Sequence, residues 1–279
     1  MAVTEHPLVG LGYTRPSATR SFLRVDADGV RATSAVVAEE VPIALVYNGR
    51  PHVVVMGSPV DLEDLGAGFS RTEGIVDESS HIERIDVVRA SHGIELQIQI
   101  PEASAIRLEE RTRGMVARTG CGLCGVETIK DMLHVPAQVG AALRVTVDAL
   151  AAASAELSRQ QTLNNETSTV HAAGWATPDG GLHVVREDIG RHNALDKVLG
   201  ALGRMGMDPS IGFVIVTSRA SYEMVQKAAT CGVELIAAIS RPTGLAVRFA
   251  SAADMTLVAL LRGGTANIYC RPERVLVTG

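Results

Sequence analysis

The chain has 279 residues, of which 46% are hydrophobic and 3% aromatic, and a formal net charge of -5. That length fits one large or two small domains with an aliphatic core, and the acidic balance argues against a broad nucleic-acid surface. The first ten residues lack the basic and apolar segments of a signal peptide, and no stretch has the roughly 20 apolar residues of a transmembrane helix. We therefore expect a cytoplasmic protein with reduced cysteines.

Residues 21–113 are predicted to form a small α+β domain, after an irregular lead-in at residues 1–20. Alternating apolar and β-branched residues indicate strands over residues 21–25, 30–37, 41–47, 52–56, 82–88 and 94–100. Asn48-Gly49 lies between two of these runs and is a strong hairpin signal. One helix is expected to begin at Ser58-Pro59 with the serine as N-cap, and another to cover residues 103–113.

Residues 114–144 are predicted to form a loop and connector that carries two of the four cysteines, with a short helix over residues 127–134. Its central run is Thr119-Gly120-Cys121-Gly122-Leu123-Cys124-Gly125. The glycines leave the thiols without side-chain cover and widen the allowed backbone conformations, which favours an exposed loop. Exposed thiols are available for chemistry, whereas a cysteine kept for packing is buried and inert.

Three kinds of chemistry fit this pair of cysteines. A structural zinc site needs a second pair of ligands, but Cys231 and Cys270 are far apart and have no cysteine or histidine close beside them. A thioredoxin-like centre places its motif at the start of a helix, where these glycines are poor helix formers. A thiol that receives a sulfur atom and carries it as a persulfide fits a solvent-facing pair best.

Residues 145–279 alternate strands and helices, as a layered α/β domain does. Strands are predicted over residues 168–175, 182–186, 213–217, 235–239, 255–261 and 266–270. Two helices are predicted over residues 145–159 and 191–202, a third is predicted to follow a cap at Ser221, and a fourth to begin near Thr243. Residues 160–167 are predicted to be a polar linker.

Polar residues cluster in three places where strands of this second block end. The clusters are Arg186 to His192, Thr217 to Ser221, and Arg262-Gly263-Gly264. Helix-start amides, hydroxyls and arginines suit a phosphate, and the carboxyl ends of strands in open α/β sheets are where ligands bind. Capped helices with solvated charges explain the first two clusters equally well.

A zinc deaminase needs one histidine and two cysteines as ligands, with a Cys-x-x-Cys in the same domain. His171 is followed by Ala172-Ala173, and the second block has no Cys-x-x-Cys. We therefore expect His171 to be a hydrogen-bonded residue of a strand or loop. His192 precedes Asp196 by one helical turn, so an ordinary pair on one helix face is expected there.

Several motifs occur together and in order: Thr119 to Gly125, Arg186 to Gly200, Ser218 to Gly232, Pro242-Thr243 and Leu257 to Tyr269. From about residue 20 to the C-terminus the chain resembles the formate dehydrogenase accessory sulfurtransferases, the FdhD/NarQ family. The resemblance implies an α/β protein, with an α+β first domain followed by a cytidine-deaminase-like three-layer α/β/α second domain at residues 145–279. The resemblance also implies that the protein is a homodimer and that the zinc chemistry has been lost. We therefore expect no structural zinc.

The resemblance further implies a sulfur carrier, or sulfurtransferase. Such a protein accepts sulfur from a cysteine desulfurase as a persulfide and transfers it to the molybdenum (or tungsten) bis-guanine-dinucleotide cofactor. The cofactor is bound as a client and then enters formate dehydrogenase. Cys121 matches the family's persulfide-bearing cysteine and Cys124 its nearby partner.

The family's cofactor-binding stretch matches six consecutive residues, Leu260, Leu261, Arg262, Gly263, Gly264 and Thr265. We place the cofactor there and at four residues of the expected crevice, Ser218, Arg219, Ser221 and His192. Thr265 stands where many members have arginine, Leu260 where an aromatic residue is usual, and Ser168-Thr169-Val170 where a glycine-rich run is usual.

Positive charge near Cys121 lowers the pKa of a thiol and so favours the attacking thiolate; Arg118 and a helix start after Gly125 are the groups expected to supply it. Cys124 could release the sulfur, protect the persulfide or form a resting disulfide. The alternative is a guanine-nucleotide-binding redox module that switches through a Cys121-Cys124 disulfide.

Overall fold

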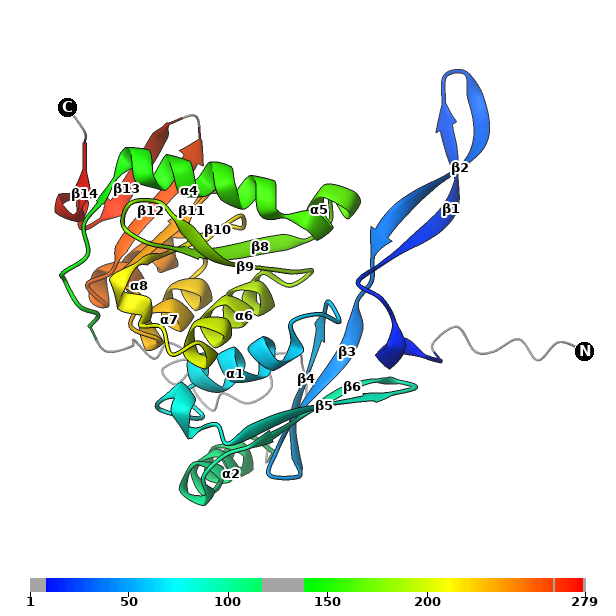
Figure 1. Cartoon of the computed structure of the whole chain (residues 1–279), viewed down its shortest axis with the longest axis horizontal. Helices are drawn as coiled ribbons and strands as arrows, with labels where there is room; N and C mark the ends of the chain where they lie inside the picture. The colour runs from blue at the N-terminus through cyan, green and yellow to red at the C-terminus, as the bar shows by residue number, and fades with distance from the viewer. Residues whose placement is uncertain (1–8, 117–137, 263, 278–279) are drawn as a thin grey trace, which may run out of the picture.

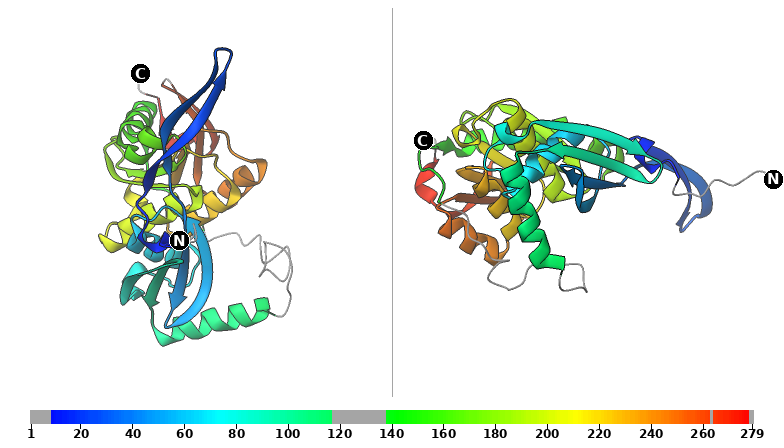
Figure 2. Two further views of the ribbon diagram at one scale, coloured as in Figure 1. Left: turned by 90° about the vertical axis from the view of Figure 1, so that its right-hand side faces the viewer. Right: turned by 90° about the horizontal axis from the view of Figure 1, so that it is seen from below.

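The computed structural model describes residues 9–116, 138–262 and 264–277, with backbone only for residues 111–116 and for Arg262. The segment with Cys121 and Cys124, and the helix expected at residues 127–134, lie outside these ranges. The described chain forms two structured blocks that pack side by side and a long hairpin that extends away from both (Figures 1 and 2). None of the helices in the described ranges is long and apolar enough to cross a bilayer.

The first block is a four-stranded sheet with two helices. Its strands are β3 (Val41–Tyr47), β4 (Arg50–Gly57), β5 (Arg84–Ala90) and β6 (Gly93–Gln99), in the order β4-β3-β6-β5. The helices are α1 (Leu62–Thr72) and α2 (Glu102–Val116), and both contribute side chains to the apolar core of this block. The predicted hairpin is confirmed: Asn48 (φ 47°) and Gly49 (φ 78°) form the tight turn between β3 and β4.

The predicted start of α1 at Ser58-Pro59 is wrong. The helix begins at Leu62, and Asp61 (φ 51°) occupies the N-cap position. Ser58 does not cap α1 because it is held by the second block: its amide donates to Asp188 Oδ2 at 3.0 Å, and its Oγ accepts from the amide of Ile189 at 3.2 Å.

The expected irregular lead-in is ordered over part of its length. A short 3-10 helix, η1 (Leu11–Tyr13), precedes β1 (Ser17–Asp26), which pairs with β2 (Gly29–Ala38) over its whole length. Both strands were predicted within a small α+β domain, but they form a separate two-stranded sheet. Alternating side chains predict a strand and do not say which surface will cover it.

The second block is built on a six-stranded sheet in the order β13-β12-β11-β10-β8-β9. The strands are β8 (His171–Ala176), β9 (Leu182–Asp188), β10 (Phe213–Val216), β11 (Leu235–Ala238), β12 (Thr256–Arg262) and β13 (Thr265–Cys270). β10, β11 and β12 are mutually parallel, and the strand pairs at both ends are antiparallel. Two short strands, β7 (Val145–Thr146) and β14 (Val275–Leu276), pair beside it.

Helices cover both faces of this sheet. On one face α4 (Val147–Gln160) packs on a core that includes Phe213 and Ile215. On the other face lie α6 (Arg191–Arg204), α7 (Tyr222–Thr230) and α8 (Gly244–Ala252), around a core that includes Trp175. Three further 3-10 turns are η2 (Ser79–His81), η3 (Pro209–Ile211) and η4 (Pro272–Arg274).

The polar linker expected at residues 160–167 is instead largely helical, as α5 (Thr162–Thr167). The carboxylate of Glu187, at the end of β9, accepts hydrogen bonds from the amides of Leu163 and Asn164, both at 2.8 Å. A carboxylate at a helix N-terminus satisfies amides that have no partner within the helix. The stabilising residue lies more than 20 positions along the chain, so the local composition of the segment gave no sign of it.

The two blocks meet where α1 crosses α6, and their backbones touch at two glycines. A Cβ atom placed on Gly68 would lie 1.7 Å from the carbonyl oxygen of Asp196, and one placed on Gly200 would lie 1.9 Å from that of Asp64. Neither position has room for a side chain. Glycine therefore permits the close contact between these two helices.

We expect Gly200→Ala to separate α1 from α6 and to lower the free energy of unfolding by about 3 kcal/mol or more, because a methyl group must displace backbone. Gly244→Ala, in α8, is the matched control, because nothing lies within 4 Å of its Cβ position; it should be neutral or slightly stabilising. Urea unfolding measures both. Equal stability of the two variants would contradict the close packing of α1 on α6.

Candidate functional site at the carboxyl edge of the large sheet

The topology brings the ends of four strands to one edge of the six-stranded sheet. β9 runs in the same direction as β10 because both are antiparallel to β8, and β11 and β12 follow that direction. Their carboxyl ends therefore lie at a single edge, here called the carboxyl edge, and β8 begins there with His171 opposite Asp188. This is the position at which open α/β sheets bind ligands.

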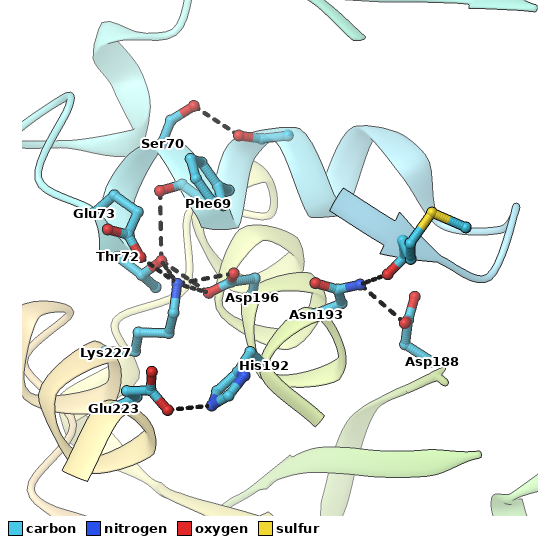
Figure 3. A network of polar contacts seen from close by, with 12 residues as sticks. Phe69, Ser70, Thr72, Glu73, Asp188, His192, Asn193, Asp196, Glu223 and Lys227 are labelled. Carbon is cyan, nitrogen blue, oxygen red and sulfur yellow. Dashed lines mark hydrogen bonds and ion pairs between the residues drawn. The ribbon is translucent and has the colours of Figure 1, made fainter. Parts of the chain in front are cut away.

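Arg191 and His192 form the first turn of α6 at the carboxyl edge. His192 Nε2 lies 2.9 Å from Glu223 Oε2 of α7 (Figure 3). Arg191 Nη2 lies 4.0 Å from the same oxygen. The hydrogen bond from His192, with the charges of His192 and Arg191, holds the pKa of Glu223 below its usual value. The expected pair between His192 and Asp196 is wrong, because the partner of His192 is Glu223.

Ser221 precedes α7, at the predicted cap position, but its side chain makes no capping hydrogen bond. Ser221 Oγ and Arg191 Nε are both buried and have no hydrogen-bond partner in the part of the chain that the structure describes. A buried polar atom without a partner costs free energy, so such atoms in a native protein call for a ligand or water. Nearby, Ser218 is buried, and its hydroxyl donates to the backbone carbonyl of Arg219. Arg219 is an exposed residue.

The local field at this edge is positive. Burial lowers the pKa of His171, and the nearby charges of Arg191 and Arg219 lower it further. His171 is therefore largely neutral at pH 7, since its ordinary pKa of about 6.5 is already below that pH. Two arginines, a neutral imidazole and an unpartnered hydroxyl suit an anion with several oxygens, such as a phosphate.

Three of the seven residues in the first predicted cluster, Arg186 to His192, have another role. Arg186 binds Asp64 of α1 through Nη2 and Oδ2 at 2.7 Å, and Glu187 holds α5. Asp188 is fully buried and lies 2.6 Å from Lys197 Nζ. These three residues are structural. Of the remaining charged side chains, Arg191 has an unpartnered Nε, whereas His192 is paired with Glu223. Sequence reasoning did not single out Lys197, because its spacing of nine residues from Asp188 matches no helical or strand repeat.

A second buried ion pair lies beside the pair of Asp188 and Lys197. It joins helices α1, α6 and α7. Lys227 Nζ of α7 lies 3.0 Å from Asp196 Oδ2 of α6, 2.7 Å from Glu73 Oε1 and 3.0 Å from Thr72 Oγ1 (Figure 3). Burial alone would lower the pKa of Lys227, but the two carboxylates outweigh it and raise the pKa above its ordinary value. Lys227 also lies over the ring of Phe69, with 5.2 Å between Nζ and the ring centroid. The network fixes α7 and its partner helices beside the carboxyl edge.

The predicted cofactor-binding stretch covers the end of β12 and the start of β13. Leu260 has a left-handed backbone (φ 55°) within an irregular part of the β12-β13 pairing, which is strained for a residue with a side chain. Leu261 is buried in the core, so any contact with a ligand falls to its backbone. Gly264 (φ 76°) and Thr265 are exposed, whereas Gly263 and the side chain of Arg262 lie outside the description.

Metal chemistry finds no support in the described ranges, where no group of three or more histidine, cysteine, aspartate or glutamate side chains could hold a metal ion. Two cysteines are described, and both are buried with free thiols. Burial raises the pKa of Cys231 to about 12 and also raises that of Cys270. Neither thiol is prepared to act as a nucleophile at neutral pH.

The fold is that of an α/β protein, and the residues at the carboxyl ends of its larger sheet are of the kinds that suit an anion. Residues 38–276 match the model of the FdhD/NarQ family, and the chain belongs to that family.

Relatives named sulfur carrier protein FdhD include one from Cupriavidus necator, 47% identical over 86% of this chain and 83% of its own length. Another, from Xanthomonas axonopodis pv. citri, is 46% identical over 94% of this chain and 93% of its own length. A crystal structure from Desulfotalea psychrophila, assigned as a formate dehydrogenase accessory protein, superposes with a TM-score of 0.73 and 25% identity. That likeness covers 93% of this chain and 99% of the other.

Asp196→Asn should lower the free energy of unfolding by about 3–5 kcal/mol, because it leaves the buried Lys227 ammonium short of a carboxylate. The control is Asp28→Asn, an exposed carboxylate in the turn between β1 and β2, which should change stability by less than about 0.5 kcal/mol. Urea unfolding followed by circular dichroism checks both values. A loss at Asp196 as small as that at Asp28 would show that the ion pair contributes nothing net.

A bound anion should raise the pKa of His171, because it offsets the charges of Arg191 and Arg219 that lower it. We expect the NMR titration midpoint of the His171 ring to lie below about 6.5 and to move upward with sulfate, whose charge is constant from pH 5 to 8. Anion binding then takes up a proton and strengthens as pH falls.

His171→Gln assigns the resonance and should remove this pH dependence. His183→Gln, at the opposite end of the β8-β9 pair, is the matched control and should retain it. A His171 midpoint that sulfate leaves unmoved would place the anion elsewhere.

Proposed function

We propose that this protein is a sulfur carrier for formate dehydrogenase. It accepts sulfur from a cysteine desulfurase as a persulfide on Cys121 and transfers it to the molybdenum bis-guanine-dinucleotide cofactor. The observation that carries this proposal is the identity of 46–47%, over most of both chains, to several relatives named sulfur carrier protein FdhD. Cys121 and Cys124 lie outside the described residues, so their roles rest on the sequence motif.

The first step is a displacement at sulfur. The Cys121 thiolate attacks the outer sulfur of the desulfurase persulfide, the sulfur-sulfur bond of the donor breaks, and the donor cysteine leaves as a thiolate. The product is a persulfide on Cys121, with no net oxidation. The reaction needs Cys121 as the thiolate, which the buried Cys231 and Cys270 could not supply at neutral pH.

Of the three roles open to Cys124, we favour release of the sulfur. Its thiolate attacks the inner sulfur of the persulfide, which expels the outer sulfur as sulfide and leaves a Cys121-Cys124 disulfide. Two electrons pass from the cysteines to the sulfur, and a dithiol reductant then restores the pair. The sulfide is delivered to the metal of the client cofactor.

The carboxyl edge is where we place the phosphate groups of that client. Arg191 Nε and Ser221 Oγ, both buried and without a partner in the described ranges, supply two donors. The exposed Arg219 adds charge at the rim, and His192 stays paired with Glu223 beneath. The exposed turn at Gly264 and Thr265 ends the family's cofactor-binding stretch. Two guanine-dinucleotide units per client match a homodimer with one such edge in each copy.

The second block fits a cytidine-deaminase-like domain in which anion binding has replaced zinc chemistry. Its six-stranded sheet has helices on both faces. His171, at the start of β8, lies within the electrostatic influence of Arg191 and Arg219, and these positive charges disfavour a bound cation. The same edge of the sheet would thus hold a nucleotide-containing client and no catalytic metal.

Incubation with cysteine and a cysteine desulfurase should add one sulfur to the wild-type chain, a gain of about 32 Da by intact mass spectrometry. Cys121→Ala should abolish the gain, because the accepting thiolate is lost. Cys124→Ala should retain the sulfur longer than wild type when a reductant is absent, because release is slowed. Cys231→Ala, with a buried thiol, is the control and should load normally.

A reversible Cys121-Cys124 disulfide with no persulfide would instead support the redox module that binds a guanine nucleotide. Loading that survives Cys121→Ala would move the carrier role to another cysteine. In either case the anion site at the carboxyl edge can still be tested by itself through His171.

A further inference from the structure

Glu223 is a carboxylate at the edge of the sheet where we place the phosphate groups of the client. It is the second residue of α7, two positions after Ser221, and its side chain is 40% exposed. Its Oε2 lies 4.0 Å from Nη2 of Arg191, whose Nε has no hydrogen-bond partner among the described residues. The arginine that would hold a phosphate therefore already has a negative charge beside it.

Contacts between α6 and α7 fix the position and the charge of the Glu223 carboxylate. Two pairs join these helices one turn apart, with 2.9 Å between His192 Nε2 and Glu223 Oε2 and 3.0 Å between Asp196 Oδ2 and Lys227 Nζ (Figure 3). The hydrogen bond from His192 and the nearby positive charges outweigh burial and hold the pKa of Glu223 below its usual value. Glu223 is therefore a fixed negative charge at neutral pH.

A carboxylate beside a phosphate site weakens the binding of every anion, but not equally. Because the repulsion is proportional to the charge of the anion, it costs a doubly charged group about twice as much as a singly charged one. Proteins reject competing ligands by such unfavourable contacts, as well as holding the correct ligand by favourable ones. A fixed carboxylate at this place therefore discriminates between phosphates by their charge.

The proposed client and its competitors differ in this charge. A guanine dinucleotide is linked through a diphosphate in which both phosphates are esterified, so each phosphate carries a single negative charge. The terminal phosphate of a free guanine nucleotide has a second ionisation with a pKa of about 6, so it carries close to two charges above neutral pH. Both kinds of molecule offer the same base, so recognition of the base does not separate them.

We propose that Glu223 is a specificity-determining residue of the carboxyl edge, which discriminates against the doubly charged terminal phosphate of a free guanine nucleotide and spares the singly charged phosphates of a dinucleotide. This inference rests on the placement of the client phosphates in the proposed function. Arg191 and Ser221 supply the attraction for either ligand, and Glu223 subtracts from it in proportion to the charge of the ligand.

Guanosine diphosphate and guanosine diphosphate mannose test this discrimination, because only the first has a free terminal phosphate. Isothermal titration calorimetry measures the Kd of each for the full-length chain at pH 8, where that phosphate is doubly charged. Glu223→Gln removes the charge and keeps the length of the side chain and an oxygen that accepts from His192. We expect it to shift the ratio of the two Kd values toward guanosine diphosphate by about tenfold, as for one charge about 6 Å away in a partly exposed site.

Glu273→Gln is the matched control. Glu273 is an exposed residue of η4, and the adjacent Arg274 binds Asp254, which lies just before β12 at the opposite edge of the sheet. This variant should leave the Kd ratio unchanged. Glu223→Asp keeps the charge and should keep the wild-type ratio, which separates the loss of charge from a structural change in α7.

The discrimination is overturned if both ligands bind and their Kd ratio is the same in wild type and Glu223→Gln, a result that leaves the phosphate site standing. It is also overturned if Glu223→Asp shifts the ratio as much as Glu223→Gln. Failure of both ligands to bind the wild-type chain would overturn the phosphate placement together with this proposal. Persulfide loading of the same preparation is read by mass spectrometry, so a failure of the sulfur carrier role is seen separately.

Discussion

The buried ion pair between Asp188 and Lys197 is the interaction on which the arrangement of this molecule depends. Both side chains are completely removed from solvent, and the Asp188 carboxylate also accepts hydrogen bonds from the amide of Ser58 and from Asn193 Nδ2. A buried charge that loses its partner is strongly destabilising, so these groups can only be buried together. Ser58, which follows β4 in the first block, donates its amide to Asp188 and accepts from Lys197 with its carbonyl, so the pair ties the end of β4 to α6 in the second block.

Helix α6 has a different role along each part of its length. Its first turn carries Arg191 and His192 at the carboxyl edge, and its middle meets α1 at Gly200 and holds Lys227 through Asp196. Because protein interiors are close-packed, a helix fixed on several sides cannot shift without disturbing all of its neighbours. Arg191 and His192 therefore stand on a rigid support that both blocks build.

The buried polar groups near the carboxyl edge differ in whether their hydrogen bonds are satisfied within the chain. Asp188 and Glu187 are buried and have all their partners within the chain. Arg191 Nε and Ser221 Oγ are buried at the carboxyl edge and have none among the described residues. Since a buried polar atom is costly to leave unpaired, this contrast is the reason for placing a ligand beside Arg191 and Ser221 in the proposal. The residue types alone do not make that distinction.

The amino-acid sequence determined most helices and strands, because hydrophobic periodicity and turn chemistry act over a few residues. Asn48-Gly49 specified its hairpin, and α8 begins near Thr243 as expected. The structure adds that Thr243 Oγ1 caps this helix by accepting from the amide of Ala246. The sequence also predicted polar clusters at the ends of strands. Because these strands run in the same direction, the fold brings the clusters to one edge of the sheet.

Only the tertiary structure decided the partner of each polar side chain. Ser58 was predicted to cap α1 but binds Asp188 instead. His192 was predicted to pair with Asp196 of its own helix but binds Glu223 of α7. The tertiary structure likewise left the β1-β2 hairpin outside the first sheet. Alternation shows that one face of a strand or helix will be covered, but the covering surface comes from residues distant in the chain, whose position depends on packing of the whole molecule.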